Sequence, residues 1–378
     1  MAWHRVMNAA AAAAAALALA GCSGSEGPKP AELVDLPNAK EVRVLWSAGA
    51  GSAGGFTFFP ALVGDAVYVA GRDGEVARLD AASGREVWRV STEAKLSGGV
   101  GAGARSVVVA TEDGVVIALE AESGKERWRG RVSTEVLAAP AVGEGLVLVR
   151  TIDSRIFGLG EDDGKRRWVY QRAGSSLILR VPAGVAILGE NAFAGFAGGK
   201  LVAVSLANGA QRWEATVALP KGSNELERIT DVIGTPALAG REVCAAAYQG
   251  RVGCYEAASG RQLWARDLSS VTGVSVDARY AFVADDRGTV HAFDRSSGAT
   301  LWKQEKLANR QLSLPLAAGA TVVVGDFEGQ VHFLSRDTGE FVTRFPAGGG
   351  PVRAAPVALS SAGLVVQTRD GDLYALSP

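Results

Sequence analysis

The side chains that most often perform chemistry, cysteine and histidine, are scarce in this chain of 378 residues. No two histidines are close in sequence, and no set of cysteines and histidines has the spacing of metal ligands. No nucleophile–base pair or carboxylate pair has the pattern of a catalytic centre. We therefore predict no metal site, no cofactor and no catalytic residue. The cysteines and histidines are Cys22, Cys244, Cys254, His4, His291 and His332.

Two of the cysteines flank a predicted hairpin turn. Cys244 and Cys254 lie on either side of Gln249-Gly250, and a turn there places them nearly opposite each other on adjacent strands. A cross-strand disulfide between them suits an oxidising compartment such as the periplasm. The alternative is a pair of buried thiols, because free cysteine packs as a small apolar side chain. The spacing alone does not decide between the two.

The third cysteine ends an N-terminal targeting segment. Residues 1–21 begin with a short polar stretch and continue as an apolar run over 9–20, which is the layout of a secretory signal peptide. The run is shorter than the roughly 20 apolar residues that a membrane-spanning helix needs. Its end, Leu19-Ala20-Gly21-Cys22, resembles the bacterial lipobox, in which the cysteine is lipidated and becomes the mature N-terminus. An ordinary cleaved signal with an incidental cysteine is the alternative.

Residues 22–40 are predicted to be the lipidated cysteine and a flexible tether, because the stretch after Cys22 is rich in Ser, Gly and Pro. In enterobacterial sorting, an aspartate after the cysteine retains a lipoprotein at the inner membrane. Ser23 stands there in this chain, so the resemblance implies the outer membrane, with the protein facing the periplasm. Several acyl chains on one cysteine make a durable anchor.

A tryptophan-bearing repeat fills residues 41–378. Segment 71–88, GRDGEVARLDAASGREVW, shows the unit: Asp73-Gly74 and Ser83-Gly84 supply two tight turns between short strands. The first turn occurs eight times. Stacked antiparallel units of this length are typical of a β-propeller, so the sequence predicts an all-β fold of eight four-stranded blades. Six of the units end in a tryptophan: Trp88, Trp128, Trp168, Trp213, Trp264 and Trp302.

The two ends of the chain complete each other in this scheme. The last unit stops at Pro378, before its tryptophan-bearing strand, whereas Trp46 stands in an extra strand-like stretch at the start. We predict that Trp46 adds the missing strand to the last blade and closes the ring. The tryptophans are interpreted as packing residues between blades, not as platforms for a sugar or a cofactor. The unit ending near Thr343 lacks one, and Phe341 or Phe345 is expected to fill its place.

Two intervals between tryptophans are longer than a blade requires, and insertions in repeat proteins often carry function. The first contains Ser175-Ser176-Leu177-Ile178-Leu179-Arg180; if this segment is a strand, Leu177 and Leu179 share one face. The second contains a polar loop over 220–232. Arg180 is able to pair with Asp231 of that loop or with an acid on a partner. The alternative is that both leucines are core residues and Arg180 caps a surface carbonyl.

The repeats resemble the pyrroloquinoline-quinone-like propeller family, and the two insertions are more specific. Ser176-Leu177-Ile178-Leu179-Arg180 and segment 225–236, ELERITDVIGTP, closely resemble the BamB family, lipoproteins of the outer-membrane β-barrel assembly machinery. Segment 323–329, VVGDFEG, is similar to that family's seventh blade. The resemblance covers the lipobox and nearly all of residues 40–378.

This resemblance implies a non-enzymatic scaffold that supports insertion of β-barrel proteins into the outer membrane. Its implied partner is BamA, bound through periplasmic POTRA domains, with other members of the assembly complex. Unfolded outer-membrane proteins that add a strand to a blade edge are a further hypothesis. The family's contact residues carry over to Leu177, Leu179, Arg180 and Asp231. Ile233 stands where the family often has a second acid, which implies a weaker or differently built acidic contact.

The rival interpretations are an enzyme and a ligand-sensing propeller. Pyrroloquinoline-quinone-dependent dehydrogenases have similar repeats, but they are longer and carry a vicinal Cys-Cys and a set of Asp, Glu and Asn residues for calcium. This chain has no Cys-Cys pair. Nucleic acid is not expected as a partner, because 39 basic and 40 acidic side chains leave no basic field. His291 and His332 follow turn glycines in successive repeats and are interpreted as blade-surface residues.

Overall fold

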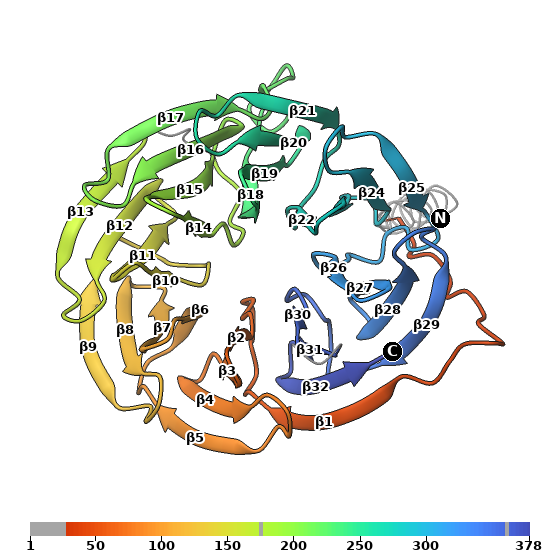
Figure 1. Cartoon of the computed structure of the whole chain (residues 1–378), viewed down its shortest axis with the longest axis horizontal. Coiled ribbons are helices and arrows are strands. Elements are labelled where there is room, and N and C mark those ends of the chain that lie inside the picture. Colours follow the sequence, from red (N-terminus) through yellow and green to blue (C-terminus); the bar gives the residue numbers. More distant parts are fainter. Residues whose placement is uncertain (1–27, 174–176, 360–362) are drawn as a thin grey trace, which may run out of the picture.

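The chain folds into a ring of eight blades around a central axis (Figure 1). The structure, a computed structural model, describes residues 28–173, 177–359 and 363–378. Each blade is a sheet of four antiparallel strands. The described residues contain no helix that is long and apolar enough to cross a membrane. The predicted all-β propeller with eight four-stranded blades is confirmed.

The first four blades use consecutive strands of the chain, from the axis outward to the rim. They are β2 (Ala61–Val63), β3 (Ala66–Ala70), β4 (Glu75–Asp80) and β5 (Glu86–Ser91) in blade 1; β6 (Leu96–Ala102), β7 (Ser106–Thr111), β8 (Val115–Glu120) and β9 (Glu126–Arg131) in blade 2; β10 (Ala141–Gly143), β11 (Leu146–Thr151), β12 (Arg155–Gly160) and β13 (Arg166–Gln171) in blade 3; and β14 (Val185–Leu188), β15 (Asn191–Phe196), β16 (Lys200–Ser205) and β17 (Gln211–Thr216) in blade 4.

Blades 5 to 7 continue in the same way, and blade 8 takes its rim strand from the start of the chain. The strands are β18 (Val232–Ala239), β19 (Glu242–Ala247), β20 (Arg251–Glu256) and β21 (Gln262–Asp267) in blade 5; β22 (Ser275–Val276), β23 (Tyr280–Ala284), β24 (Val290–Asp294) and β25 (Thr300–Gln304) in blade 6; β26 (Leu316–Ala318), β27 (Thr321–Gly325), β28 (Gln330–Ser335) and β29 (Phe341–Pro346) in blade 7; and β30 (Val357–Ala358), β31 (Leu364–Gln367), β32 (Asp372–Ser377) and β1 (Arg43–Gly49) in blade 8.

The first turn of each blade explains the repeated glycine. It joins the second and third strands, and Gly74 and Gly114 have φ values of 104° and 79° there, a region that favours glycine. In blade 3 Ser154 replaces the glycine and still adopts a φ of 62°. Because antiparallel strands alternate in direction, these turns and the connections between blades all lie on one face of the ring. We call it the connection face.

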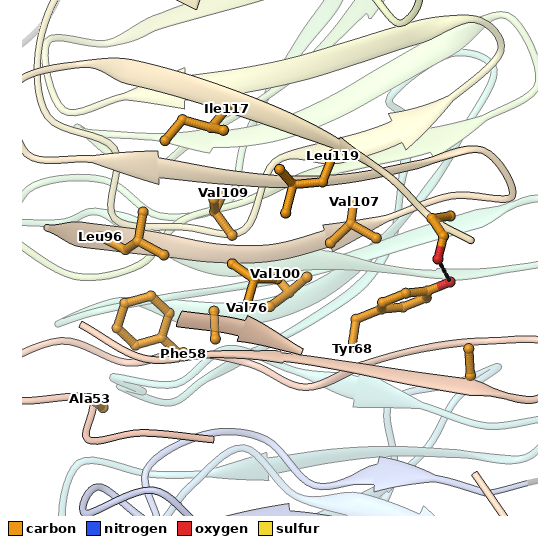
Figure 2. Close-up of a cluster of buried hydrophobic side chains, with 13 residues drawn as sticks. Ala53, Phe58, Tyr68, Val76, Leu96, Val100, Val107, Val109, Ile117 and Leu119 are labelled. Carbon is orange, nitrogen blue, oxygen red and sulfur yellow. Dashed lines mark hydrogen bonds between the residues drawn. The ribbon is translucent and has the colours of Figure 1, made fainter. Parts of the chain in front are cut away.

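Apolar layers between neighbouring blades hold the ring together. Figure 2 shows the layer between blades 1 and 2, where Phe58 and Tyr68 of blade 1 pack on Leu96, Val109 and other apolar side chains of blade 2. Most side chains of the second and third strands are buried in this way. Since a single blade exposes two apolar faces, each depends on its neighbours for burial, as expected for a closed propeller.

The tryptophans pack between blades, as predicted. Trp128 of blade 2 donates its indole N–H to the Glu161 carbonyl of blade 3 at 2.8 Å. Its ring covers the second-turn glycine of that blade, Gly164, where a Cβ would lie 2.5 Å from the ring. Six other tryptophans repeat both contacts, each with the next blade: Trp46, Trp88, Trp168, Trp213, Trp264 and Trp302.

The ring closes where the two ends of the chain pair. β1 lies antiparallel to β32, with Trp46 opposite Ala375 and Ser47 opposite Tyr374. The N-terminal strand therefore completes blade 8, as predicted, and its tryptophan packs on blade 1 through the Ala81 carbonyl.

Blade 7 lacks a tryptophan because of this join. Blade 8 has no turn between its third and fourth strands, so a tryptophan in β29 would meet no turn glycine. Thr343 stands at the tryptophan position, opposite Phe333 of β28; in blade 6 an alanine is opposite the tryptophan. The bulky side chain has moved to the neighbouring strand. Of the two expected replacements, Phe345 contacts Tyr374 of blade 8 with ring centroids 5.3 Å apart, whereas Phe341 packs toward blade 6.

The segment before β1 is fixed to blade 7. Residues 28–42, called the strap below, pass outside β29 on their way to β1 (Figure 1). The Thr343 hydroxyl donates to the Lys40 carbonyl at 2.5 Å, and Val42 is buried with Phe333 between blades 7 and 8. Within the tether predicted over residues 22–40, hydrogen bonds hold the part from Lys29 onward against the ring.

Candidate functional site

The two insertions are connections between blades and lie on the connection face. Residues 172–184 join β13 of blade 3 to β14 of blade 4, and residues 217–231 join β17 of blade 4 to β18 of blade 5. Residues 177–180 have no strand conformation. The condition under which Leu177 and Leu179 would share one face of a strand is therefore not met.

Asp231 fastens the first insertion to the second. Its Oδ2 accepts a hydrogen bond from the Leu179 N–H at 2.7 Å, and the Gly198 N–H also contacts the carboxylate. Only 7% of the residue is exposed. Burial raises the pKa of this carboxyl, against the lowering effect of the two N–H groups and the nearby Arg150. Asp231 thus positions the backbone of the first insertion and presents little acidic surface.

Arg180 points toward blades 1 to 3 and pairs with Glu135, so of the two partners considered for it, Asp231 is not the one that it contacts within the chain. Its guanidinium forms a two-pronged ion pair with Glu135, with Nε 3.0 Å from Oε2, and Glu112 lies 3.6 Å away. The hydrogen bond with Glu135 raises the pKa of Arg180. The guanidinium carbon is 5.4 Å from the centre of the Phe56 ring. The Arg180 side chain remains 55% exposed, so this cation is oriented and still accessible.

The charges around Arg180 form a connected set. Arg72 of blade 1 pairs with Glu112, donates to the Leu96 carbonyl at 2.7 Å and lies 4.5 Å from the centre of the Phe56 ring. Two cations and two carboxylates therefore alternate across blades 1 to 3. Their sum is zero, so the set orients Arg180 without creating a broad field.

Leu177 and Leu179 are half-buried and border two different cavities. Leu179 borders a narrow cavity of about 40 Å³, lined also by Leu137, Ala138, Arg150, Thr151, Ile152, Ser154, Ile178, Val181, Ala183, Ala197, Asp231, Val232 and Ile233. Leu177 borders a wider one of about 220 Å³ between the insertions, lined also by Gly198, Pro220, Glu225, Arg228, Ile229, Thr230 and Asp231. The two leucines do not form one flat apolar patch.

The second insertion adds apolar surface beside the wider cavity. Leu219 and Leu226 are 65% and 68% exposed, more than the other large apolar residues that the structure describes. The Thr230 hydroxyl is buried and has no hydrogen-bond partner in the structure. Ile233, at the position where an acid was expected from the family resemblance, is buried at 2% exposure. The second insertion therefore presents two apolar side chains among exposed charged residues, and no acid at position 233.

Arg150 supports both insertions from within the blade. Its guanidinium donates to the Ala183 carbonyl at 3.2 Å and lies 4.7 Å from the centre of the Phe196 ring. Burial lowers the pKa of Arg150 to about 10, partly offset by the charge of Asp231. A buried cation requires acceptors and a counter-charge, so Arg150 links the ends of the two insertions.

The remaining candidate residues lie elsewhere. Cys22 is outside the described residues. Cys244 and Cys254 are disulfide-bonded across β19 and β20, with Cα atoms 4.0 Å apart. Among the residues that the structure describes, no group of three or more His, Cys, Asp or Glu side chains is arranged to hold a metal ion.

His291 and His332 are buried, which corrects their interpretation as blade-surface residues. Each Nε2 lies 2.9 Å from a carboxylate six residues earlier, on Asp285 and Asp326 respectively. The aspartate sits in the first turn of the blade and supplies a polar partner for one ring nitrogen inside the sheet. Neither histidine is near the insertions.

Comparison with known proteins identifies the family. A family model described as outer membrane protein assembly factor BamB matches residues 38–91 and 72–304, well over half of the chain. The chain belongs to the BamB family. Members of the family that it resembles include the BamB proteins of Bordetella pertussis, 43% identical over 360 residues (94% of this chain and 93% of that one), and Pseudomonas aeruginosa, 46% identical over 346 residues (90% and 91%).

Solved structures agree with this membership. The crystal structure of BamB from Moraxella catarrhalis matches with a TM-score of 0.81 at 27% identity, covering 89% of this chain and all of that one. The quinohemoprotein alcohol dehydrogenase of Comamonas testosteroni matches with a TM-score of 0.69 at 14% identity, over 89% of this chain and 76% of that one. The second likeness shows a shared propeller fold alone.

Sequence reasoning did not find the residues that hold Arg180. Glu135 and Glu112 lie in or next to ordinary turns of blades 2 and 3, and nothing in the repeat distinguishes them. Phe56 precedes the first blade, and Arg72 is part of a first turn. One weak signal exists, since all of them lie on the connection face, where residues distant in sequence converge.

Proposed function

We propose that this protein is a non-enzymatic scaffold lipoprotein of the outer-membrane β-barrel assembly machinery. Cys22 anchors it in the outer membrane, facing the periplasm, and the two insertions bind the POTRA domains of BamA. The observation that carries the proposal is the half-exposed, ion-paired guanidinium of Arg180 beside the openings bordered by Leu177 and Leu179. Membership of a family whose members are named outer membrane protein assembly factors supports it.

The geometry suits non-covalent docking. Glu135 and Phe56 already hold the Arg180 side chain, so binding immobilises it at little further cost in entropy. A carboxylate or carbonyl of the partner can accept from its remaining N–H groups. Apolar side chains of the partner can cover Leu226 and enter the opening beside Leu177. A central cation with an apolar surround is a common arrangement at protein interfaces.

The enzyme alternative gains no support from the fold. A likeness at 14% identity to a quinohemoprotein dehydrogenase reports the propeller architecture, and functions are placed on a fold by particular sites. The charged residues beside the first insertion are engaged with one another as Arg–Glu pairs. We therefore assign them to positioning and recognition.

Co-purification and titration with the BamA periplasmic domains test the proposal. Arg180→Ala should weaken the complex by about tenfold to a hundredfold, because a charged hydrogen bond contributes roughly 1.5–3 kcal/mol. Arg287→Ala, in the first turn of blade 6 on the same face, is the matched control and should bind normally. Equal losses in both variants, or none in Arg180→Ala, would show that the docking surface is elsewhere.

Asp231 allows a sharper test, because the structure gives it a positioning role. Asp231→Asn keeps an oxygen that can accept the Leu179 N–H and should bind almost as well as the wild type. Asp231→Ala removes that acceptor, frees the first insertion and should weaken the complex. If the asparagine variant loses as much as the alanine variant, the carboxylate contacts the partner directly and the positioning role is wrong.

A further inference from the structure

The strap is recognised through its backbone by side chains around blade 7. The Ala31 N–H donates to the Ala308 carbonyl at 2.8 Å, and the Asn309 side-chain amide donates to the Lys29 carbonyl at 2.9 Å. Arg310 donates to the Ala31 carbonyl at 2.9 Å. Further along, Arg344 donates to the Val34 carbonyl at 3.2 Å and Thr343 to that of Lys40. Contacts of this kind fix the path of a segment whatever its side chains.

Buried charges fix the two arginines from beneath. Arg310 is 2% exposed, and its Nε lies 2.6 Å from Oδ2 of Asp326, which is fully buried. Arg344 donates to Nδ1 of His332 at 3.2 Å. Arg310 also pairs with Glu328, and one further N–H group of each arginine donates to a strap carbonyl. The strap carbonyls therefore accept from side chains that the ring itself holds in place, so the strap is part of the folded ring.

The strap begins at the connection face and ends at the opposite one. Asn309, which holds the start of the strap, lies at the connection face, because its N–H donates to the Arg287 carbonyl in the first turn of blade 6 at 2.7 Å. From this point the strap passes outside β29 to the start of β1 (Figure 1). The chain therefore reaches the ring at the edge of blades 6 and 7, opposite blades 2 and 3.

We propose that the strap orients the ring on the membrane. It brings the chain from Cys22 to the connection-face edge of blades 6 and 7, so this edge is kept close to the phospholipid surface. Only seven residue steps separate Cys22 from Lys29. At about 3.3–3.6 Å each, they span at most roughly 25 Å. Blade 2, opposite blade 6 in the ring, is not restrained in this way. The inference rests on the lipidation of Cys22 proposed above.

Energy transfer from the full-length lipoprotein to labelled lipid tests the orientation. The acylated protein is placed in vesicles of phosphatidylethanolamine and phosphatidylglycerol that carry an acceptor lipid. A donor dye is attached at Arg287→Cys in blade 6 or at Asp113→Cys in blade 2. Both positions precede a first-turn glycine and are exposed. Transfer from position 287 should exceed that from 113 by about twofold or more, because the short tether limits the distance of the first edge alone.

A strap variant separates orientation from simple ring closure. Ala31→Pro with Asn309→Gly removes two donors at the strap's entry and leaves the buried arginines in place; glycine suits the φ of 60° at position 309. The entry of the strap is then loosened as far as the contact of Arg310 with the Ala31 carbonyl, the tether gains a few residues, and the difference between the two dyes should shrink. Glu32→Pro, where no backbone N–H bond is lost, should retain it.

The outcomes are distinguishable. An intact mass without acyl chains overturns both the anchor and the orientation. An acylated protein with equal transfer from both dyes overturns the orientation alone. A difference that is as large in the double variant as in the wild type shows that the strap only closes the ring, and overturns its orienting role.

Discussion

The interface between blades 2 and 3 and the interface between blades 7 and 8 fill the same space by different means. In the first, Trp128 lies on Gly164 and donates to a carbonyl of blade 3 at 2.8 Å. In the second, Thr343 donates to the Lys40 carbonyl, and Phe333 of the neighbouring strand supplies the bulk. The difference shows that the turn of the next blade determines the rim residue. The repeat holds where the chain is continuous and changes where its ends meet.

Removing a tryptophan from a regular interface should have the largest effect on stability. Trp128→Ala is expected to lower the free energy of unfolding by about 3–5 kcal/mol, because it opens a cavity and leaves the Glu161 carbonyl without its donor. Thr343→Val, at the same position of blade 7, should cost only about 1 kcal/mol, the value of one hydrogen bond. Urea denaturation of both variants measures the difference. Similar losses would mean that Thr343 is as important to its interface as the tryptophan.

Blade 5 provides a covalent variant of the regular interface, since Cys254 is the small residue opposite Trp264. Its bond to Cys244 closes a loop of about ten residues. Cys244→Ala with Cys254→Ala should lower the free energy of unfolding by roughly 2–4 kcal/mol. Thiol labelling of the denatured wild-type protein provides the control: no label at these positions without reductant indicates the disulfide, and ready labelling shows two thiols instead.

The regular part of the ring could be predicted because its signals are local. Asp-Gly turns such as Asp73-Gly74 need only their own φ angles, and the tryptophan spacing reports one blade at a time. Ring closure through Trp46 followed from the incomplete last unit. The small residue Thr343 at the tryptophan position and the large Phe333 opposite it could not be predicted from the sequence, because this arrangement depends on a turn that is missing from a different blade.

The candidate site was predictable in position but not in its contacts. Family resemblance marked Arg180, yet its partner is Glu135, which comes from another blade connection. The triplet Ser-Thr-Glu occurs twice, at 91–93 and 133–135. Only the second glutamate meets Arg180, and nothing local distinguishes it. The burial of His291 and His332 was missed for a similar reason. The glycine pattern predicted the turn before each histidine, but it did not show that the aspartate six residues earlier forms a hydrogen bond with the ring.

Restoring the repeat residue in blade 7 should be destabilising. Thr343→Trp places a large ring where the strap carbonyl of Lys40 and the side chain of Phe333 already fill the space, and Thr343 is 2% exposed. We expect a loss of about 1–3 kcal/mol from overpacking, although tryptophan occupies this position in the other blades. Adding Phe333→Ala should recover part of it, because alanine is opposite tryptophan in blade 6. If Thr343→Trp alone is more stable than the wild type, the strap moves aside without cost and the site is not overpacked.

The smallest expected effect is a pH dependence confined to blade 7. Burial lowers the pKa of His332 below its ordinary value, against the raising effect of Asp326 and with help from the positive charges of Arg344 and Arg310. The folded state therefore prefers the neutral imidazole, whose Nδ1 accepts from Arg344. Stability is lost as pH falls below about 6.5, where the unfolded histidine gains its proton, by at most about 1.4 kcal/mol per pH unit.

The difference in urea midpoint between wild type and His332→Gln should shrink from pH 7.5 to 5.5. A constant difference would mean that the protonated ring fits the site equally well.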